Sequence, residues 1–291
     1  MKSRFLFVVS AGVASAIAVA APVPVGPAAK SFRLGAFRVT ALRDMVNAVP
    51  NDGSVFGKDV GPAAVKTLLD ADHLDDTTLQ LGVDALLVQE PGRTILIDTG
   101  LGPKVGGALP RSLALAGIDP AAVTDVLITH SHGDHVGGLV TATGALAFPN
   151  ATIRLSATEW AWMQGKPSNA ELAAAIAFKV RTFSPGGVVA PGIRSVPLAG
   201  HTPGHVGYQI KSEGQRLIDI GDVAHSAVVS LEKPAWINGY DTDATGGRVR
   251  RETTLAMLAA HGDHVFAPHF PFPGTGKIVK TASGYAWQPD R

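Results

Sequence analysis

The segment Val126-Leu127-Ile128-Thr129-His130-Ser131-His132-Gly133-Asp134-His135 carries the strongest prediction of fold in this sequence. Its first four residues are aliphatic or β-branched and predict a strand buried on both faces, and Gly133 allows a tight turn soon after it. Three imidazoles and one carboxylate then fall within six residues. Core packing rarely produces such a cluster, whereas a divalent cation stabilises it. The segment therefore predicts a metal site at the end of a buried strand.

The spacing His-x-His-x-Asp-His, at residues 130–135, matches the signature of the metallo-β-lactamase superfamily. The chain resembles this family over nearly all of its length after Phe32. Further motifs follow in the family's order and at similar spacing: Ile97-Asp98-Thr99-Gly100, Gly200-His201-Thr202-Pro203-Gly204-His205, Gly221-Asp222 and Ala267-Pro268-His269. The resemblance implies an α/β fold, a four-layer αββα sandwich with a dinuclear metal site at the strand ends.

The resemblance also implies a ligand set for two metal ions. The ligands would be His130, His132 and His201 for one ion, Asp134, His135 and His269 for the other, and Asp222 as a bridge between them. Asp98 is expected to support the ligand loop through hydrogen bonds to imidazole N–H groups. The chain has no cysteine, so thiolate ligands are excluded. We expect two divalent ions per chain. Zn²⁺ is the favoured metal, and Co, Mn or Fe would suit the same ligands.

Two ions that share a water would lower its pKa to about 7 and supply a bridging hydroxide as the nucleophile. Asp134 is expected to accept a proton and return it near the leaving group. His225 follows Asp222 by three residues and is expected to project into the cleft as a second catalytic group. Lactonases of the superfamily often carry a tyrosine at that position. His132 stands where a redox di-iron member would carry glutamate, so the resemblance favours hydrolysis over electron transfer.

Several segments resemble the methyl parathion hydrolase and lactonase branch of the superfamily: residues 128–139, 148–151, 200–205, 221–225, 269–274 and 284–285. The resemblance implies cleavage of an ester-type bond in a small molecule, either a lactone of the quorum-signal type or an aryl phosphotriester. A β-lactamase and a glyoxalase II-like thioesterase are alternatives. A non-enzymatic metal-containing binding module is the alternative of another class, because a fold alone does not establish activity.

An apolar leaving group would need an apolar wall, for which four aromatic residues are candidates: Trp160, Trp162, Phe183 and Phe272. Aromatic residues at helical spacing are usually core residues. Trp160 and Trp162 are two positions apart and cannot face the same direction on a helix, so at most one of them is expected in the pocket. The isolated His205 is expected to stabilise its loop and not to bind metal.

The first 21 residues have the pattern of a secretory signal peptide. Lys2 and Arg4 precede an acid-free apolar run from Phe5 to Ala20, and Ala18-Val19-Ala20 resembles a cleavage site. A membrane anchor is the alternative, but the run is weakly apolar and barely long enough to span a bilayer. We therefore expect an exported protein, periplasmic or secreted, without a stable membrane anchor after signal removal.

Composition limits the partners of the remaining chain. Of 291 residues 46% are hydrophobic and 17% charged, as in a globular protein. Loss of Lys2 and Arg4 leaves 23 of the 25 basic residues against 24 acidic ones, so nothing attracts nucleic acid. Residues 22–31, rich in Pro, Ala and Gly, are expected to be flexible, and residues 32–291 to form the hydrolase domain. The resemblance makes a homodimer possible.

Local patterns predict strands and helices along this domain. The expected strands are 85–89, 94–98, 125–129, 152–155, 194–198, 206–211, 216–220 and 264–267. The expected helices are 62–70, 159–164, 170–182 and 248–260. Apolar runs on both faces of several strands imply sheets that are covered by helices.

Overall fold

The computed structural model describes residues 21–23 and 25–290 of the chain. The signal peptide expected over residues 1–21 therefore lies outside the described residues, except for its last position. The helices are α1 Pro62–Ala71, α2 Leu109–Leu115, α3 Gly133–Val136, α4 Ala157–Gln164, α5 Ala170–Ile176, α6 Val229–Glu232 and α7 Ala244–His261. Within the described range no helix is long and apolar enough to cross a membrane.

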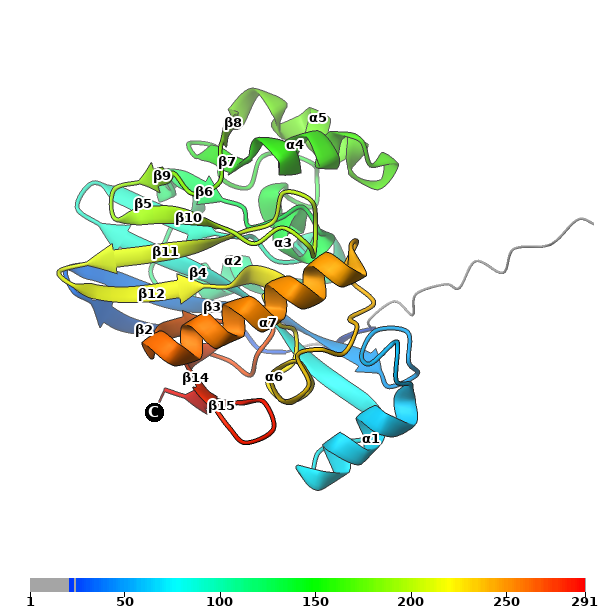
Figure 1. Ribbon diagram of the computed structural model, residues 1–291. Helices are drawn as coiled ribbons and strands as arrows, with labels where there is room; N and C mark the ends of the chain where they lie inside the picture. Colours follow the sequence, from blue (N-terminus) through cyan, green and yellow to red (C-terminus); the bar gives the residue numbers. More distant parts are fainter. Residues whose placement is uncertain (1–20, 24, 291) are drawn as a thin grey trace, which may run out of the picture.

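The strands form two sheets that face each other (Figure 1). The first sheet holds β1 Ala21–Val23, β2 Ala29–Leu34, β3 Phe37–Pro50, β4 Thr78–Glu90, β5 Arg93–Ile97, β6 Asp125–Leu127, β7 Thr152–Ser156 and β8 Val180–Phe183. The second sheet holds β9 Val188–Ala190, β10 Ile193–Pro197, β11 Val206–Ser212, β12 Gln215–Asp219, β13 His264–Phe266, β14 Thr275–Lys280 and β15 Tyr285–Pro289. Strands β5, β6, β7 and β8 run parallel to one another, and so do β12 and β13, whereas the other pairs are antiparallel.

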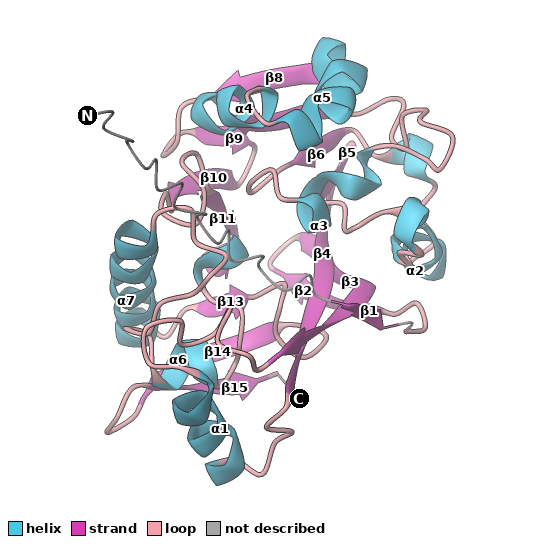
Figure 2. Cartoon of the chain, turned by 90° about the vertical axis from the view of Figure 1, so that its right-hand side faces the viewer, coloured by secondary structure: helices cyan, strands magenta, loops and turns pink. Residues whose placement is uncertain are grey.

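Three apolar clusters separate the layers. Between the sheets, Val88 and Ile95 pack in one cluster with Tyr208 and Phe266. A second cluster joins the outer face of the first sheet to α2, α4 and α5, and a third joins the second sheet to α7. Figure 2 shows these layers edge-on, with α7 on one side of the strands and α2 and α3 on the other. The predicted αββα sandwich is confirmed.

The long antiparallel strands β3 and β4, whose connection contains α1, extend beyond the sandwich and carry a fourth apolar cluster. Their outer ends pack with α1 and α6 through residues such as Val49, Leu69 and Leu81. The pairing shifts register between Arg43 and Met45. Such a bulge changes the direction of the extra residue, here Asp44. Its carboxylate accepts the backbone N–H of Leu101, in the loop after β5, and that of Leu109, at the start of α2.

Each predicted strand is present, but two predictions about other segments are wrong. The helix expected over 170–182 ends at Ile176, and a short 3₁₀ turn then leads into β8. The periodic apolar residues continue past the helix end because Val180 is also buried, as part of a strand. Residues 29–31, expected to be flexible, lie in β2, which pairs with β3.

Candidate metal centre

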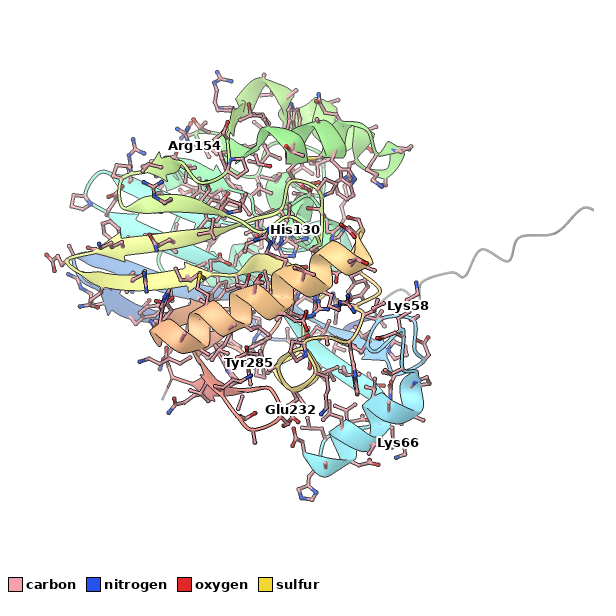
Figure 3. All side chains as sticks on the ribbon, in the orientation of Figure 1. Lys58, Lys66, His130, Arg154, Glu232 and Tyr285 are labelled. Carbon is pink, nitrogen blue, oxygen red and sulfur yellow. The ribbon has the colours of Figure 1, made fainter. Side chains whose placement is uncertain are left out.

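The candidate ligands meet at one edge of the sandwich because of the strand directions. Asp98 follows β5, and residues 130–135 follow the parallel strand β6. Asp222 and His269 follow the parallel pair β12 and β13, whereas His201 precedes β11, which runs antiparallel to β12. All of these loops therefore lie at the same edge, where sites in α/β folds form. Figure 3 labels His130 in this region, close to the strand ends.

Three imidazoles converge to form the first group. His132 Nδ1 lies 3.1 Å from Nε2 of His130 and 2.8 Å from Nε2 of His201. Oδ2 of Asp222 lies 3.5 Å from Nε2 of His130 and 3.2 Å from Nε2 of His201. These four residues form one of the compact clusters able to hold an ion. It is the ligand set predicted for the first metal, joined to the predicted bridge.

The second group lies on the other side of Asp222. His135 Nε2 is 3.1 Å from Asp222 Oδ1, and His269 Nε2 is 3.1 Å from Asp222 Oδ2. Asp134 Oδ2 lies 3.8 Å from His135 Nε2 and 3.7 Å from His269 Nε2. The structure thus brings together all seven residues predicted as metal ligands, with Asp222 between the two groups.

Hydrogen bonds to Nδ1 show which ring nitrogen faces the centre. The Nδ1 proton of His135 is donated to Asp98, that of His269 to the carbonyl oxygen of Gly82, and that of His201 to Asp241. The Thr129 hydroxyl donates to Asp98 and so accepts from Nδ1 of His130. When any of these four rings is neutral, its lone pair is therefore on Nε2, an arrangement that orients histidines toward metals.

The residues fit a pair of metal ions. His135 Nε2 and Asp222 Oδ1 are buried and make no hydrogen bond within the described part of the chain. Lone pairs of imidazoles and carboxylates that face one another at about 3 Å repel unless a proton or cation lies among them. A pair of divalent cations would partner these orphaned atoms and the facing nitrogens together.

Burial and neighbouring charges shift the pKa values of several candidate ligands. Burial raises the pKa of Asp222, but His135 and His269 outweigh it and hold the pKa well below its usual range. Burial lowers the pKa of His201, but the hydrogen bond and charge of Asp222 raise it to about 9. Burial and the neighbouring His135 hold the pKa of His130 well below its usual value. Protons thus occupy some of the nitrogens that a metal would need.

Two predicted supporting roles have clear structural counterparts. Asp98 accepts hydrogen bonds from the Thr129 backbone and hydroxyl at 2.8 and 2.7 Å and from His135 Nδ1 at 2.7 Å. His205 donates from Nδ1 to the carbonyl of Leu198 and accepts the backbone N–H of Asp222. Both nitrogens of His205 are therefore engaged, and it braces the loop beside the ligands.

Sequence patterns did not reveal Glu159 as a supporting residue. Its buried carboxylate accepts hydrogen bonds from the Ser131 backbone and hydroxyl at 2.8 and 2.7 Å. The other oxygen accepts from the Thr202 hydroxyl at 2.7 Å and the Gly204 backbone at 3.0 Å. Glu159 thus ties the loop of His130 to that of His201. In the sequence it appears only as a polar residue near the start of a helix.

A second missed group lies in the loop before α7. Asp241 accepts from His201, and its other oxygen lies 3.2 Å from Nη1 of Arg251. His225, predicted as a catalytic group, is buried with Nε2 3.1 Å from Asp222. Its ring lies against Tyr240, with the ring centres 5.5 Å apart. No motif marks this loop, so only its place in the fold reveals these contacts.

The predicted aromatic wall is only partly where it was expected. Trp162 lies beside the centre, its ring 5.7 Å from that of His132. Trp160 packs against the core under α4. Phe183 and Phe272 pack against the cluster between the sheets. These last three side chains therefore fill cores where the sequence suggested a pocket, and Tyr240 is an aromatic neighbour that it did not suggest.

Comparison with known proteins agrees with this geometry. The family model of the metallo-beta-lactamase superfamily matches residues 79–269, which include every candidate ligand. The chain belongs to the metallo-beta-lactamase superfamily. The uncharacterized protein YobT of Bacillus subtilis strain 168 is 29% identical over 211 residues, which are 69% of this chain and 86% of YobT.

Two solved structures of this superfamily cover nearly the whole chain. AidC, a dizinc quorum-quenching lactonase, superposes with a TM-score of 0.87 at 28% identity, over 91% of this chain and 98% of AidC. The hydrolase AbOPH superposes with a TM-score of 0.83 at 29% identity, over 92% of this chain and 99% of AbOPH. The protein is thus a metallo-beta-lactamase-fold hydrolase with a metal-binding group of histidines and aspartates.

Proposed function

We propose that this protein hydrolyses the ring ester of acyl-homoserine lactones with two bound divalent ions, and that zinc is the preferred metal. The observation that carries the proposal is the convergence of imidazole Nε2 and Nδ1 atoms on both sides of Asp222. The whole-chain likeness to AidC, whose structure holds the product of a lactone, supports the choice of substrate.

Two ions held there would supply Lewis acidity for the substrate carbonyl and lower the pKa of the attacking water to about 7. The chain's own residues then have separate tasks. Burial raises the pKa of Asp134, but His135 and His269 lower it below its usual value, so the carboxylate is a proton acceptor at neutral pH. Asp134 is partly exposed and can return that proton to the alkoxide that leaves when the ester bond breaks.

Aromatic side chains beside the centre suit an apolar acyl group. Trp162 lies next to His132, and Tyr240 lies next to His225. Burial, together with the charges of Asp134 and Asp222, raises the pKa of Tyr240 to about 12, so its hydroxyl stays protonated at neutral pH. Tyr240 can therefore donate a hydrogen bond near the centre, although its position differs from that of the tyrosine that lactonases of the superfamily often carry where this chain has His225.

An export route accompanies the proposal. The apolar run before Ala21 would direct the chain out of the cytoplasm, where it would meet diffusible lactones. Mass measurement of the mature N-terminus in a fractionated native host tests this: a cytoplasmic chain with its first 21 residues intact would contradict export. The oligomeric state of the same preparation tests the homodimer that the resemblance makes possible.

The decisive experiment combines metal analysis and turnover on one preparation. Elemental analysis should find about two metals per chain. Hydrolysis is compared for N-hexanoyl-homoserine lactone, an aryl dialkyl phosphate, a cephalosporin and a glutathione thioester. Lactone cleavage that disappears in Asp222→Ala supports the proposal. If the enzyme prefers one of the other three substrates, hydrolysis of that substrate replaces lactone opening as the proposed function. Two metals per chain without turnover of any substrate would favour the binding module.

A further inference from the structure

His225 differs from four of the five candidate ligand histidines in the nitrogen that carries its proton. His225, Asp222 and His269 lie close enough together to form a third cluster able to hold an ion, so geometry alone would allow His225 as a ligand. Four of the five candidate ligand histidines, His130, His135, His201 and His269, donate from Nδ1 and direct Nε2 to the centre. His132 directs Nδ1 there instead. The neighbours of His225 impose the opposite arrangement to that of the four.

The side-chain amide of Asn238 determines which nitrogen of His225 carries the proton, through one hydrogen bond at its oxygen and one at its nitrogen. Its side-chain oxygen accepts the backbone N–H of Tyr240 at 2.9 Å. The amide nitrogen, which can only donate, is therefore the atom that lies 2.8 Å from His225 Nδ1. Nδ1 must accept this hydrogen bond, so the proton of a neutral His225 ring is on Nε2, 3.1 Å from Asp222 Oδ2. Asn238 is buried, and no amide flip satisfies both neighbours.

We infer that Asn238 is a positioning residue that holds His225 as an Nε2–H hydrogen-bond donor and keeps it from binding metal. The donor is aimed at Asp222, between the two groups of candidate ligands, and there it would stabilise a substrate carbonyl oxygen that becomes negative. This inference rests on the proposed function for the identity of the reacting oxygen. The assignment of the proton rests on hydrogen-bond geometry alone.

The rest of the loop is built to hold Asn238 in place. The guanidinium of Arg251, buried under the loop, donates to the carbonyl oxygens of Pro234 at 2.9 Å and of Trp236 at 2.8 Å. The backbone of His225 is fixed separately, by the hydroxyl of Ser230 at 3.2 Å. Both partners of the Asn238–His225 hydrogen bond are thus anchored from different elements, so their relative position does not depend on a bound substrate.

The first test measures the tautomer directly. Long-range ¹H–¹⁵N spectra of the histidine-labelled full chain distinguish Nε2–H from Nδ1–H rings, and the His225→Gln spectrum identifies the His225 signals. We expect Nε2–H for His225 in the chain with and without zinc. An Nδ1–H ring, or a zinc-induced shift of Nε2 typical of ligation, would overturn the inference. This test needs no variant of Asn238 to fold.

The second test reverses one hydrogen bond. In Asn238→Asp the carboxylate still accepts from Tyr240, but its other oxygen now requires a donor, so His225 should shift its proton to Nδ1. Loss of the donor should lower kcat for the lactone roughly 100-fold, while KM changes less than about threefold. Asn150→Asp makes the same charge change on the exposed surface and should leave both constants unchanged. A reversed tautomer with unchanged kcat would exclude a catalytic donor.

Metal content separates this inference from the proposed function. His225→Gln should retain about two metals per chain, because His225 is not a ligand, and loss of one metal would overturn the inference. If the wild-type chain shows the Nε2–H ring and two metals but hydrolyses no lactone, the proposed function fails and the assignment of the proton stands.

Discussion

Asp241 and His201 form a 3.1 Å hydrogen bond that connects the metal centre to the helix behind it. The aspartate is held in turn by the fully buried guanidinium of Arg251 on α7. Nδ1 of His201 is thereby kept protonated, and Nε2 is kept aimed at Asp222. A candidate metal ligand thus takes its orientation from a loop and a helix that share no motif with it.

Replacing Asp241 by asparagine should weaken metal binding. The amide keeps the size of the side chain but presents a weaker acceptor to His201 and leaves Arg251 without its carboxylate partner. Changes of this kind typically cost 10- to 100-fold in metal affinity. Competition with a chelator of known affinity measures the effect. Asp243→Asn, an exposed change at the N-cap of α7 that retains a capping side chain, is the control. Equal affinities in both variants would contradict the role of Asp241.

Glu159→Gln should destabilise the chain itself. Four N–H and O–H donors of Ser131, Thr202 and Gly204 face the buried carboxylate. A glutamine would turn an amide nitrogen toward two of them, and each buried group without a partner costs about 1–3 kcal/mol. We expect a loss of about 2–4 kcal/mol in the free energy of unfolding, measured by urea denaturation without metal. Glu171→Gln on the exposed surface should change it by less than about 0.5 kcal/mol.

Metal affinity should rise with pH across the neutral range. The pKa of His201 in the metal-free chain is about 9, so below that pH a proton occupies the Nε2 that a metal would bind. His269 has a raised pKa as well: burial lowers it, but Asp222 outweighs burial. Metal binding must therefore release protons, and the apparent affinity should increase from pH 7 until it levels off near pH 9. Calorimetry in buffers of different ionisation enthalpy counts the protons, and a count of zero at pH 7 would contradict these shifts.

The fold was predictable from the sequence because its decisive segments are local. The run 126–135 contains a buried strand, a turn and four candidate ligands within ten residues, and the other candidate ligands follow strands marked by runs of aliphatic and β-branched residues. The failures occur where one pattern suits two structures. Val180 continues a helical period and also begins a strand, so only the parallel pairing of β8 with β7 decides between them.

The supporting residues of the site were not predictable in the same way. Asp241 and Asn238 act on histidines that are 40 and 13 positions away in the chain, and their loop contains no periodicity or motif. Their roles depend on which side-chain atom faces which ring nitrogen. These atoms meet only when the loop packs against α7, so residue type and spacing in the sequence cannot predict the contacts.

Trp162 should determine the preference for acyl-chain length. Its ring lies beside His132, and the Lys166 ammonium group lies 4.6 Å from the ring centre on α4's C-terminal side. Removing an apolar contact area of this kind costs about 25 cal/mol per Å² that the substrate buries there. Trp162→Ala should therefore lower kcat/KM for a decanoyl lactone about tenfold and for a butanoyl lactone much less. Trp160→Leu, on the same helix but directed into the core, should reduce stability and leave the ratio of the two substrates unchanged. If Trp162→Ala lowers both substrates equally, the indole does not contact the acyl chain, and the specificity of the site must come from elsewhere.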